Sequence, residues 1–463
     1  MSVSNMSDRF DVVIVGARCA GSPLALFLAR AGLSVCVVDQ AGFPSDTLST
    51  HMFQLSGIEV MKELGVLDAV LACGAPPILD TYMKFEDADL SGAPRLLPND
   101  IQIPMLCVRR ISLDVNLVEA VREAGIDLRL HRRVTGLIER DGRVRGVTVQ
   151  SRDGKTSNIE ADLVVGADGR ASTVARLTGA RRYHVVPSER ISTWAYFRNV
   201  PREPVARVFY YRKDDDFIVA APADDGHFIA VACPSLDRLD SEYRTDSERW
   251  FMRTMARCQP VGDLLAGAER VTKFRGLTRF EGFFREATGA GWVLAGDAGH
   301  FKDPTPGQGI SDALRQVKKL SQAIVRGLAK PGTLDRELND WWRWRDHDGI
   351  QHHWFSFDVG KGGPLSPVMV EILRGIARND ETRKDFLDIF IHRQWPRNLF
   401  GLRALVGATG RLLANPARRE GALADAMRLV RVELDRRTQG LLPRLTQRTQ
   451  VDEVHLDHQP SAA

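Results

Sequence analysis

The stretch FDVVIVGARCAGSPLALFLARAGLSVCVVDQ, residues 10–40, decides the fold of this protein. DVVIVG (11–16) is a short β-branched run that ends at glycine, which is typical of a strand buried on both faces of a parallel sheet. SPLALFLARAG (22–32) has a proline in its first turn and a terminal glycine, and therefore predicts a helix. SVCVVD (34–39) predicts a second buried strand. Together they predict a βαβ unit.

Such a unit presents backbone N–H groups and a helix N-terminus to a diphosphate, and an acid after the second strand to a ribose hydroxyl. Gly16 fits the tight turn, Gly21 the close packing of helix on strand, and Asp39 the ribose contact. Arg18 stands where the usual fingerprint has its second glycine, so the motif reads G-x-R-x-x-G. We interpret Arg18 as a side chain that turns outward and whose charge suits a diphosphate. A purely structural βαβ unit is the alternative.

Composition narrows the class of protein. The chain has 463 residues, 44% apolar and 26% charged, which indicates a soluble globular protein with two or three domains. The net charge of +4 comes without a dense basic block, so we expect no nucleic-acid partner. The chain has neither an apolar run long enough for a membrane span nor a secretory signal, which predicts a cytoplasmic protein. Six scattered cysteines without a C-x-x-C pair predict reduced thiols and no bound metal.

Two later stretches repeat the strand-and-glycine pattern. IEADLVVGADGRASTVARLTGA (159–180) predicts a strand that ends in a Gly-Ala-Asp-Gly turn before a helix. GAGWVLAGDAGHFKDPTPGQGISDALRQVKKLSQAI (289–324) predicts a strand ending at Gly296-Asp297, a Pro/Gly-rich loop and an amphipathic helix. In this order and spacing, the three segments resemble FAD-dependent monooxygenases of the p-hydroxybenzoate hydroxylase type. That group lies within the glutathione-reductase-like superfamily, which also holds flavin halogenases and geranylgeranyl reductases.

The resemblance implies FAD as cofactor, with NADH or NADPH as a transient co-substrate. It places the carboxylate of Asp297 at the ribitol chain and the start of the helix after Gln308 at the pyrimidine edge of the flavin. VRRISLDVNLVEAV (108–121) resembles the family's R-x-x-L-D-x-x-L helix start, so Arg110 is an expected FAD contact, with Arg109 second. The expected cofactor-binding residues are Gly16, Arg18, Cys19, Ala20, Gly21, Asp39, Arg110, Val134, Asp168, Gly169, Gly296, Asp297, Pro304, Gly307, Gln308, Gly309 and Ile310.

The expected fold class is α/β: a Rossmann-like FAD-binding domain built from discontinuous segments, with an inserted antiparallel-sheet substrate domain and C-terminal helices. The expected boundaries are 1–180 and 286–330 for the FAD-binding segments, 181–285 for the substrate sheet and 331–463 for the helical region with a polar tail. β-rich runs separated by Asp-rich turns in residues 206–234 predict an antiparallel meander. Phe209, Tyr211, Phe217 and Phe228 are candidates for the substrate wall, but alternation places half of them on the other face.

The segment DTLSTH (46–51) departs from a plain connection. Relatives run a loop past the flavin here, so the resemblance places Thr50 and His51 near the isoalloxazine ring as substrate candidates. His51 is a candidate base for a phenolic substrate because histidine titrates near neutral pH. A surface or capping histidine is the alternative.

The activity implied by the resemblance is oxygenation. An FAD-dependent monooxygenase uses NAD(P)H and O2 to hydroxylate or epoxidise an aromatic or polyketide-like small molecule through a flavin C4a-hydroperoxide, so no nucleophile triad is needed. A reductase of a prenyl or other unsaturated chain is the main alternative. The W-x-W-x-I-P pattern of flavin halogenases is missing, which disfavours halogenation. A non-enzymatic flavoprotein-fold binding protein is a further alternative. An external flavin reductase, and a monomer or a homodimer, stay open.

Overall fold

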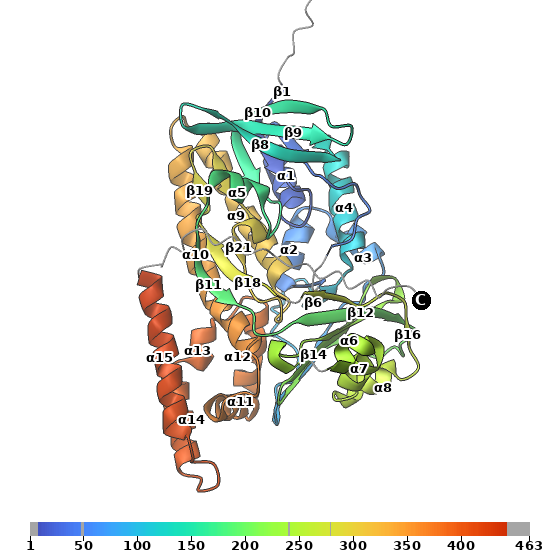
Figure 1. Ribbon diagram of the computed structural model, residues 1–463, viewed down its shortest axis with the longest axis vertical. Helices are drawn as coiled ribbons and strands as arrows, with labels where there is room; N and C mark the ends of the chain where they lie inside the picture. Colours follow the sequence, from blue (N-terminus) through green and yellow to red (C-terminus); the bar gives the residue numbers. More distant parts are fainter. Residues whose placement is uncertain (1–7, 48–50, 239–240, 278, 442–463) are drawn as a thin grey trace, which may run out of the picture.

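The computed structural model describes residues 8–47, 51–238, 241–277 and 279–441. A parallel sheet with its helices forms one end of the protein, a second sheet lies at the other end, and the C-terminal helices run along one side (Figure 1). The expected α/β class with C-terminal helices is confirmed.

The first sheet has the strand order β19-β20-β10-β1-β2-β7, and the strands from β20 to β7 run parallel. Its strands are β1 (Asp8–Val15), β2 (Val35–Val38), β7 (Asp127–Arg129), β10 (Thr156–Gly166), β19 (Thr288–Gly289) and β20 (Trp292–Leu294). The hairpin of β8 (Arg132–Arg140) and β9 (Arg143–Ser151) joins it through β10. Both faces of β1 are buried, as its sequence predicts: Val12 and Ile14 pack in one core cluster and Val13 and Val15 in another.

The helices packed with this sheet include α1 (Gly21–Arg30), α2 (Leu55–Glu63), α3 (Leu67–Ala72), α4 (Arg110–Glu123), α5 (Thr173–Thr178) and α9 (Gly309–Ala329). The glycine turn between β1 and α1 is required by close packing. A Cβ at Gly21 would lie 1.7 Å from the carbonyl oxygen of Gly16. Gly16 itself has a φ of +106°, and its Cβ would lie 2.3 Å from the carbonyl oxygen of Ala167. No side chain fits at either position.

The second sheet has the order β16-β12-β15-β14-β13-β4-β5, with β17 also paired to β12. Its strands are β4 (Asp80–Phe85), β5 (Ala88–Asp89), β12 (Ser192–Arg198), β13 (Arg207–Lys213), β14 (Asp216–Pro222), β15 (Phe228–Ala232), β16 (Glu269–Arg270) and β17 (Arg275–Leu277). The meander of β13, β14 and β15 is antiparallel, as expected. One boundary expectation is corrected: β4 and β5 lie in 1–180, yet β4 pairs in parallel with β13, because long-range pairing satisfies its backbone here.

The two faces of the second sheet pack differently. On β12, Trp194 and Tyr196 join the core cluster that includes the C-terminal helices, whereas Ala195 and Phe197 face the helical cover of α7 (Ser247–Met255) and α8 (Gln259–Leu265). The short helix α6 (Ser241–Thr245) precedes this cover. The face that carries Trp194 is therefore the one turned toward the rest of the protein.

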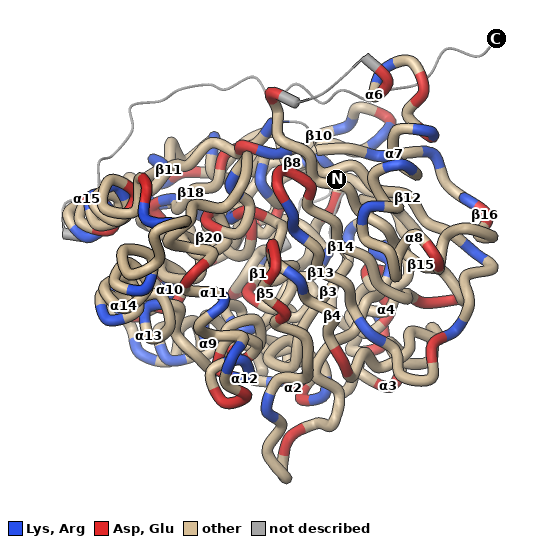
Figure 2. The backbone as a smooth tube through the Cα atoms, turned by 90° about the horizontal axis from the view of Figure 1, so that it is seen from below, with Lys and Arg blue, Asp and Glu red and all other residues tan. Residues whose placement is uncertain are grey.

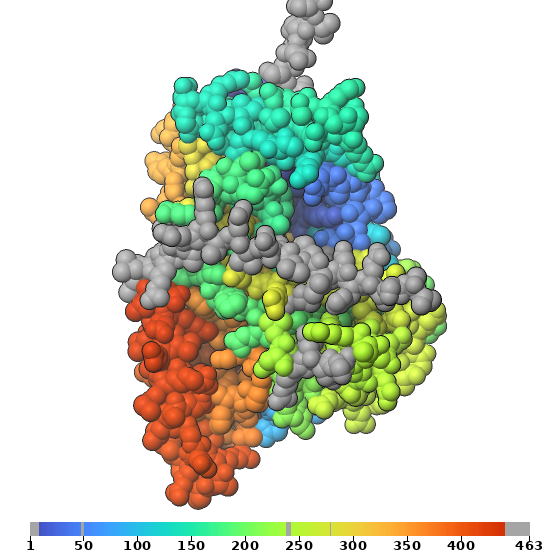
Figure 3. All heavy atoms as spheres, in the orientation of Figure 1, coloured from blue at the N-terminus to red at the C-terminus, as the bar shows by residue number. Residues whose placement is uncertain are grey.

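A small sheet of β11 (Arg182–Pro187), β18 (Glu281–Arg285) and β21 (His300–Phe301), and the pair of β3 (Met52–Gln54) and β6 (Met105–Cys107), connect the two large sheets. The C-terminal region consists of α10 (Leu334–Val359), α11 (Pro367–Ala377), α12 (Asp380–Phe390), α13 (Pro396–Phe400), α14 (Leu402–Leu413) and α15 (Ala422–Leu441). In the space-filling view these helices, orange to red, form one flank of the molecule (Figure 3).

In the described part of the chain, acidic and basic residues are interspersed along the backbone (Figure 2). Among the helices that the structure describes, none is both long and apolar enough to cross a membrane. The described residues also hold no group of three or more His, Cys, Asp or Glu side chains arranged to bind a metal ion.

Candidate functional site

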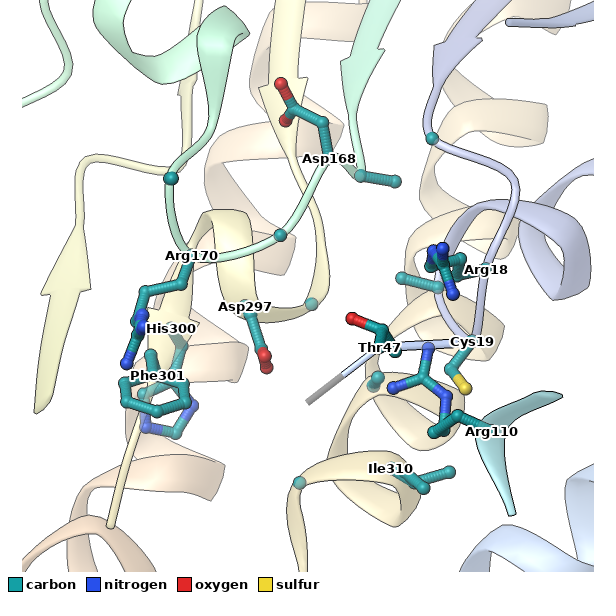
Figure 4. A pocket seen from close by; sticks show the side chains of 18 of the residues that line it. Arg18, Cys19, Thr47, Arg110, Asp168, Arg170, Asp297, His300, Phe301 and Ile310 are labelled. Atoms are coloured by element: carbon teal, nitrogen blue, oxygen red, sulfur yellow. The ribbon is translucent and has the colours of Figure 1, made fainter. Parts of the chain in front are cut away.

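A cavity of about 590 Å³ lies where the glycine turn, the start of α9 and the second sheet meet. Figure 4 shows Arg18, Cys19 and Arg110 on one side of it, Arg170, His300 and Phe301 on the other, and Asp297 projecting between them. The expected cofactor-binding residues that line the cavity are Gly16, Arg18, Cys19, Ala20, Asp39, Arg110, Val134, Asp168, Gly169, Gly296, Asp297, Pro304, Gly309 and Ile310. Segments far apart in the sequence thus meet around one space.

Arg18 is held by contacts beside the glycine turn. Its Nη1 donates to Oδ2 of Asp114 at 2.5 Å and its Nη2 donates to Oγ of Ser45 at 2.9 Å, while its guanidinium lies 5.2 Å from the ring centroid of Phe43. Arg110 donates to the same fully buried carboxylate through Nε and Nη2, both at 3.0 Å. Two arginines therefore share one carboxylate, which leaves a net positive charge at the cavity wall. That charge suits a diphosphate.

Cys19 also borders this cluster, with its Sγ 3.5 Å from Oδ1 of Asp114. Burial raises the pKa of Cys19 to about 12, so the group is a neutral thiol at neutral pH. It is a small buried side chain rather than a reactive thiolate.

Asp39 stands at the end of β2 and organises the turn. Its Oδ2 accepts the backbone N–H of Ala17 and its Oδ1 accepts that of Ala41, both at 2.8 Å. Each carboxylate oxygen retains a lone pair, because an ionised carboxylate accepts about four hydrogen bonds. Asp39 can therefore hold the turn and accept a ligand hydroxyl together.

Asp168 and Gly169 follow β10 on the opposite rim. The Asp168 carboxylate accepts the Ser172 hydroxyl at 2.5 Å and the Thr173 backbone N–H at 2.7 Å. Burial raises the pKa of Asp168, against the lowering effect of these hydrogen bonds. The Asp168 carboxylate therefore stabilises the turn before α5.

Asp297 differs from the other two acids, because among the described residues only burial and the charges of its neighbours act on its carboxylate, with no hydrogen bond. Burial raises its pKa to about 6, against the lowering effect of Arg110 and Arg170 and with a smaller raising contribution from Asp312. A carboxylate that faces a cavity with both oxygens available is suited to accept ligand hydroxyl groups.

Three expected residues do not line the cavity. Gly21 is buried against the Gly16 carbonyl. Gly307, at a φ of +69°, accepts the Gln54 side-chain amide on its carbonyl at 2.7 Å. The fully buried Gln308 directs its Nε2 to the carbonyl oxygens of Ile389 and Phe390 at the end of α12. These residues shape the turn and the loop instead of facing the space.

The second sheet contributes an apolar wall from neighbouring strands. Trp194 and Val231 are direct cross-strand partners on β12 and β15, and Ser192 is the partner of Leu277 on β17. All four line the cavity.

The expected wall residues are corrected by their placement. Phe209 and Phe228 lie in the core under α7 and α8, and Tyr211 packs against the same core. Phe217 faces the other side but packs against Phe85, 5.9 Å between ring centroids, and does not reach the cavity. Strand register put these rings into structural cores.

The expectation for His51 is also corrected. His51 is buried outside the cavity lining, with its ring 5.5 Å from that of Tyr196. Burial and the nearby Arg110, Arg275 and Arg109 lower the pKa of His51 to about 3, which makes it a weak base at neutral pH. Thr50 lies outside the described residues, whereas Thr47, three positions earlier in the sequence, lines the cavity.

Sequence reasoning missed several residues of this site. Asp114 could have been predicted from the sequence, since it is the acidic residue of the R-x-x-L-D-x-x-L pattern and stands one helical turn after Arg110. Trp194 lies in strand β12, and the alternation of its residues does not tell which face of the sheet each side chain occupies. Lys302 and Asp312 also line the cavity, and only tertiary packing brings them together.

The glycine turn, the two-arginine cluster and the acids that line the cavity define a dinucleotide-binding protein whose donors and acceptors fit FAD. Residues 9–337 match the family model of the FAD binding domain. The chain belongs to this family, and it is an FAD-dependent oxidoreductase of the flavoprotein monooxygenase group.

Curated relatives carry more than one activity. The chain is 30% identical over 354 residues to rifampicin monooxygenase of Streptomyces venezuelae, covering 70% of this chain and 67% of the relative. It is 27% identical over 369 residues to digeranylgeranylglycerophospholipid reductase 1 of Methanococcoides burtonii, covering 74% and 81%. It is 23% identical over 344 residues to 1H-pyrrole-2-carbonyl-[peptidyl-carrier protein] brominase of Pseudoalteromonas luteoviolacea, covering 72% and 79%.

Among solved structures, p-nitrophenol 4-monooxygenase of Pseudomonas putida superposes with a TM-score of 0.69 at 18% identity, covering 85% of this chain and 100% of that chain. At this identity the likeness shows the fold alone.

Proposed function

We propose that the protein is a monooxygenase that uses NADH or NADPH and O2 to insert one oxygen atom into an aromatic or polyketide-like small molecule. The observation that carries the proposal is the shared cavity. Its lining holds both the dinucleotide residues Gly16 and Asp39 and the apolar residues Trp194 and Val231 of the second sheet. A largely apolar wall with few polar groups is the usual lining of a small-molecule site.

In this proposal FAD occupies the cavity from the glycine turn to the start of α9, and when bound it supplies the redox chemistry. Arg18 and Arg110 offer positive charge to the diphosphate, Asp39 a ribose contact, and Asp297 the contact to the ribitol hydroxyls. The N-terminus of α9, with Gly309 and Ile310, gives N–H groups and partial positive charge to the pyrimidine edge. Trp194, Val231 and Leu277 exclude water and orient the substrate. No described side chain is assigned as a catalytic base.

The relatives support oxygenation and also keep reduction of an unsaturated chain as a second candidate, since both activities occur among them. Halogenation has less support from this chain, because its sequence lacks the W-x-W-x-I-P pattern of flavin halogenases, even though a brominase is among its relatives.

The deciding experiment supplies the FAD-loaded protein with NADH or NADPH, ¹⁸O2 and a panel of phenols and polyketide-like aromatics. We expect faster flavin bleaching with a true substrate and one labelled oxygen in the product. Anaerobic saturation of a double bond would favour the reductase. A flavin that stays oxidised with both nicotinamides, but oxygenates when reduced flavin is added, would assign reduction to an external flavin reductase.

A further inference from the structure

The loop that leads into α9 forms hydrogen bonds with the C-terminal region. Gln308 Nε2 donates to the carbonyl oxygens of Ile389 and Phe390 at 3.0 and 3.2 Å. The Tyr210 hydroxyl donates to the Pro306 carbonyl at 3.2 Å, and the Tyr210 ring packs 5.6 Å from that of Phe390. Residues 389–392 lie beyond the part of the chain that matches the FAD-binding family.

A buried ion pair spans the same loop and the first turn of α9. Lys302 Nζ lies 2.7 Å from Oδ2 of Asp312 and donates to Oε1 of Gln308 at 2.8 Å. His392, directly after α12, places its Nε2 2.7 Å from the other oxygen of Asp312. Lys302 and Asp312 both line the cavity. Through His392, the C-terminal region therefore contacts the Asp312 carboxylate of an ion pair that lies at the cavity wall.

The charges of this pair balance each other in a buried setting, and Arg315, 3.9 Å from the Asp312 carboxylate, is itself paired with Asp348 at 2.7 Å. Burial alone would raise the pKa of Asp312, but Lys302 and His392 hold it well below its usual value, so the carboxylate is ionised. Burial lowers the pKa of Lys302, against the raising effect of Asp312. The field of Asp312 reaches the cavity, because Asp312 lines the same cavity as Asp297. An unbalanced charge here would act on any group in the cavity.

We propose that Lys302 and Asp312 form a charge-balanced pair that tunes the reduction potential of the bound flavin, and that His392 and Gln308 are positioning residues through which the C-terminal region holds this pair. The inference rests on the proposed placement of the flavin at the start of α9, and not on the oxygenation reaction. Reduction adds negative charge to the flavin, so an unpaired Asp312 disfavours the reduced form and an unpaired Lys302 favours it.

The test measures the two-electron midpoint potential of the FAD-loaded protein by anaerobic dye equilibration, without substrate. We expect Lys302→Met to shift the reduced-to-oxidised ratio at least tenfold toward the oxidised form, which is about 30 mV for a two-electron couple. Asp312→Asn should shift it by a similar factor in the opposite direction. The double variant should return close to the wild-type value, because each single change removes only one half of the pair.

The ion pair of Arg436 and Asp358, with Nη2 and Oδ1 2.6 Å apart on α15 and α10, provides the matched control. Arg436→Met and Asp358→Asn should leave the potential unchanged. If the Lys302 and Asp312 variants lose thermal stability but keep the wild-type potential, the pair is only structural and the proposal fails. Because a buried Asp312 without its lysine partner can prevent folding of Lys302→Met, the Asp312→Asn variant alone also tests the proposal. An unchanged potential in that variant overturns it.

Hydrogen exchange tests the positioning part. His392→Leu and Gln308→Leu should increase exchange in residues 302–312, whereas His392→Gln, which keeps a polar side chain beside Asp312, should resemble the wild type. Unchanged exchange in both Leu variants overturns the role given to the C-terminal region. A protein that shows these shifts but never oxygenates a substrate would remove the proposed function and leave this inference standing.

Discussion

Arg18 and Asp114, 96 residues apart in the sequence, are joined by a 2.5 Å hydrogen bond at the wall of the cofactor cavity. This contact explains how a G-x-R-x-x-G turn keeps the geometry of a dinucleotide site. The guanidinium leaves the turn sideways, toward Asp114 and Ser45, so the backbone of the turn stays open. The position of the usual second glycine is thus occupied by an arginine whose side chain is bound by Asp114 and Ser45.

Restoring the usual glycine with Arg18→Gly should leave FAD bound. The loss of one positive charge should weaken binding by only about 1 kcal/mol, since the site is partly solvated and salt screens the field. Quenching of FAD fluorescence on titration of the apoprotein, at low and high salt, measures this change. A variant that purifies colourless and refuses added FAD would make Arg18 a principal phosphate ligand.

Asp39→Ala should weaken FAD binding by about 1 to 3 kcal/mol, through the lost ribose contact and the two backbone N–H groups left without their acceptor. The same fluorescence titration reports the dissociation constant. Asp11→Asn is a suitable control, because Asp11 binds the backbone and hydroxyl of Ser34 away from the cavity. Equal affinities for Asp39→Ala and the wild type would remove the ribose role.

Asp297→Asn should change how the stability of the apoprotein depends on pH. The folded-state pKa of about 6 lies above the unfolded value of 3.8, so the folded protein holds the proton more tightly. The wild type therefore loses stability as pH rises from about 4 to 6, and the variant lacks this loss. Urea unfolding at pH 4.5 and 7 should show the variant gaining relative to the wild type at the higher pH. The opposite sign would contradict the raised pKa.

Trp194→Phe should raise KM for the substrate about tenfold and leave kcat nearly unchanged, because a shortened apolar wall removes binding common to the ground and transition states. Steady-state kinetics with a confirmed substrate measures both constants. Tyr211→Phe, on the face covered by α7 and α8, should be neutral. A larger effect at Tyr211 than at Trp194 would reverse the assignment of the two sheet faces.

His51→Asn should retain activity. The buried imidazole is a weak base, and asparagine tolerates the positive φ of 63° at this position. The rate of product formation and its pH profile test this expectation. A loss of about a hundredfold or more, the usual contribution of a general base, would restore the catalytic role that the sequence suggested.

Local patterns sufficed to predict the βαβ unit, and together with the family resemblance they predicted fewer than half of the residues that line the cavity. A buried strand, a glycine turn and an acid at the strand end are short-range features whose spacing alone fixes where they stand in such a fold. Gly16 and Asp39 could therefore be identified one by one, and the resemblance added Asp297. The resemblance supplied their common cofactor.

Tertiary structure determined which residues form the apolar wall of the cavity and which residues form the ion pair of Lys302 and Asp312. Phe209 and Trp194 both lie in strands, and only the pairing register and the helices α7 and α8 determine which side each faces. His51 loses its basicity through burial, which no local pattern reveals. Lys302 reaches Asp312, and Asp312 reaches His392 from the C-terminal region, because folding brings distant segments into contact and removes water between their charges.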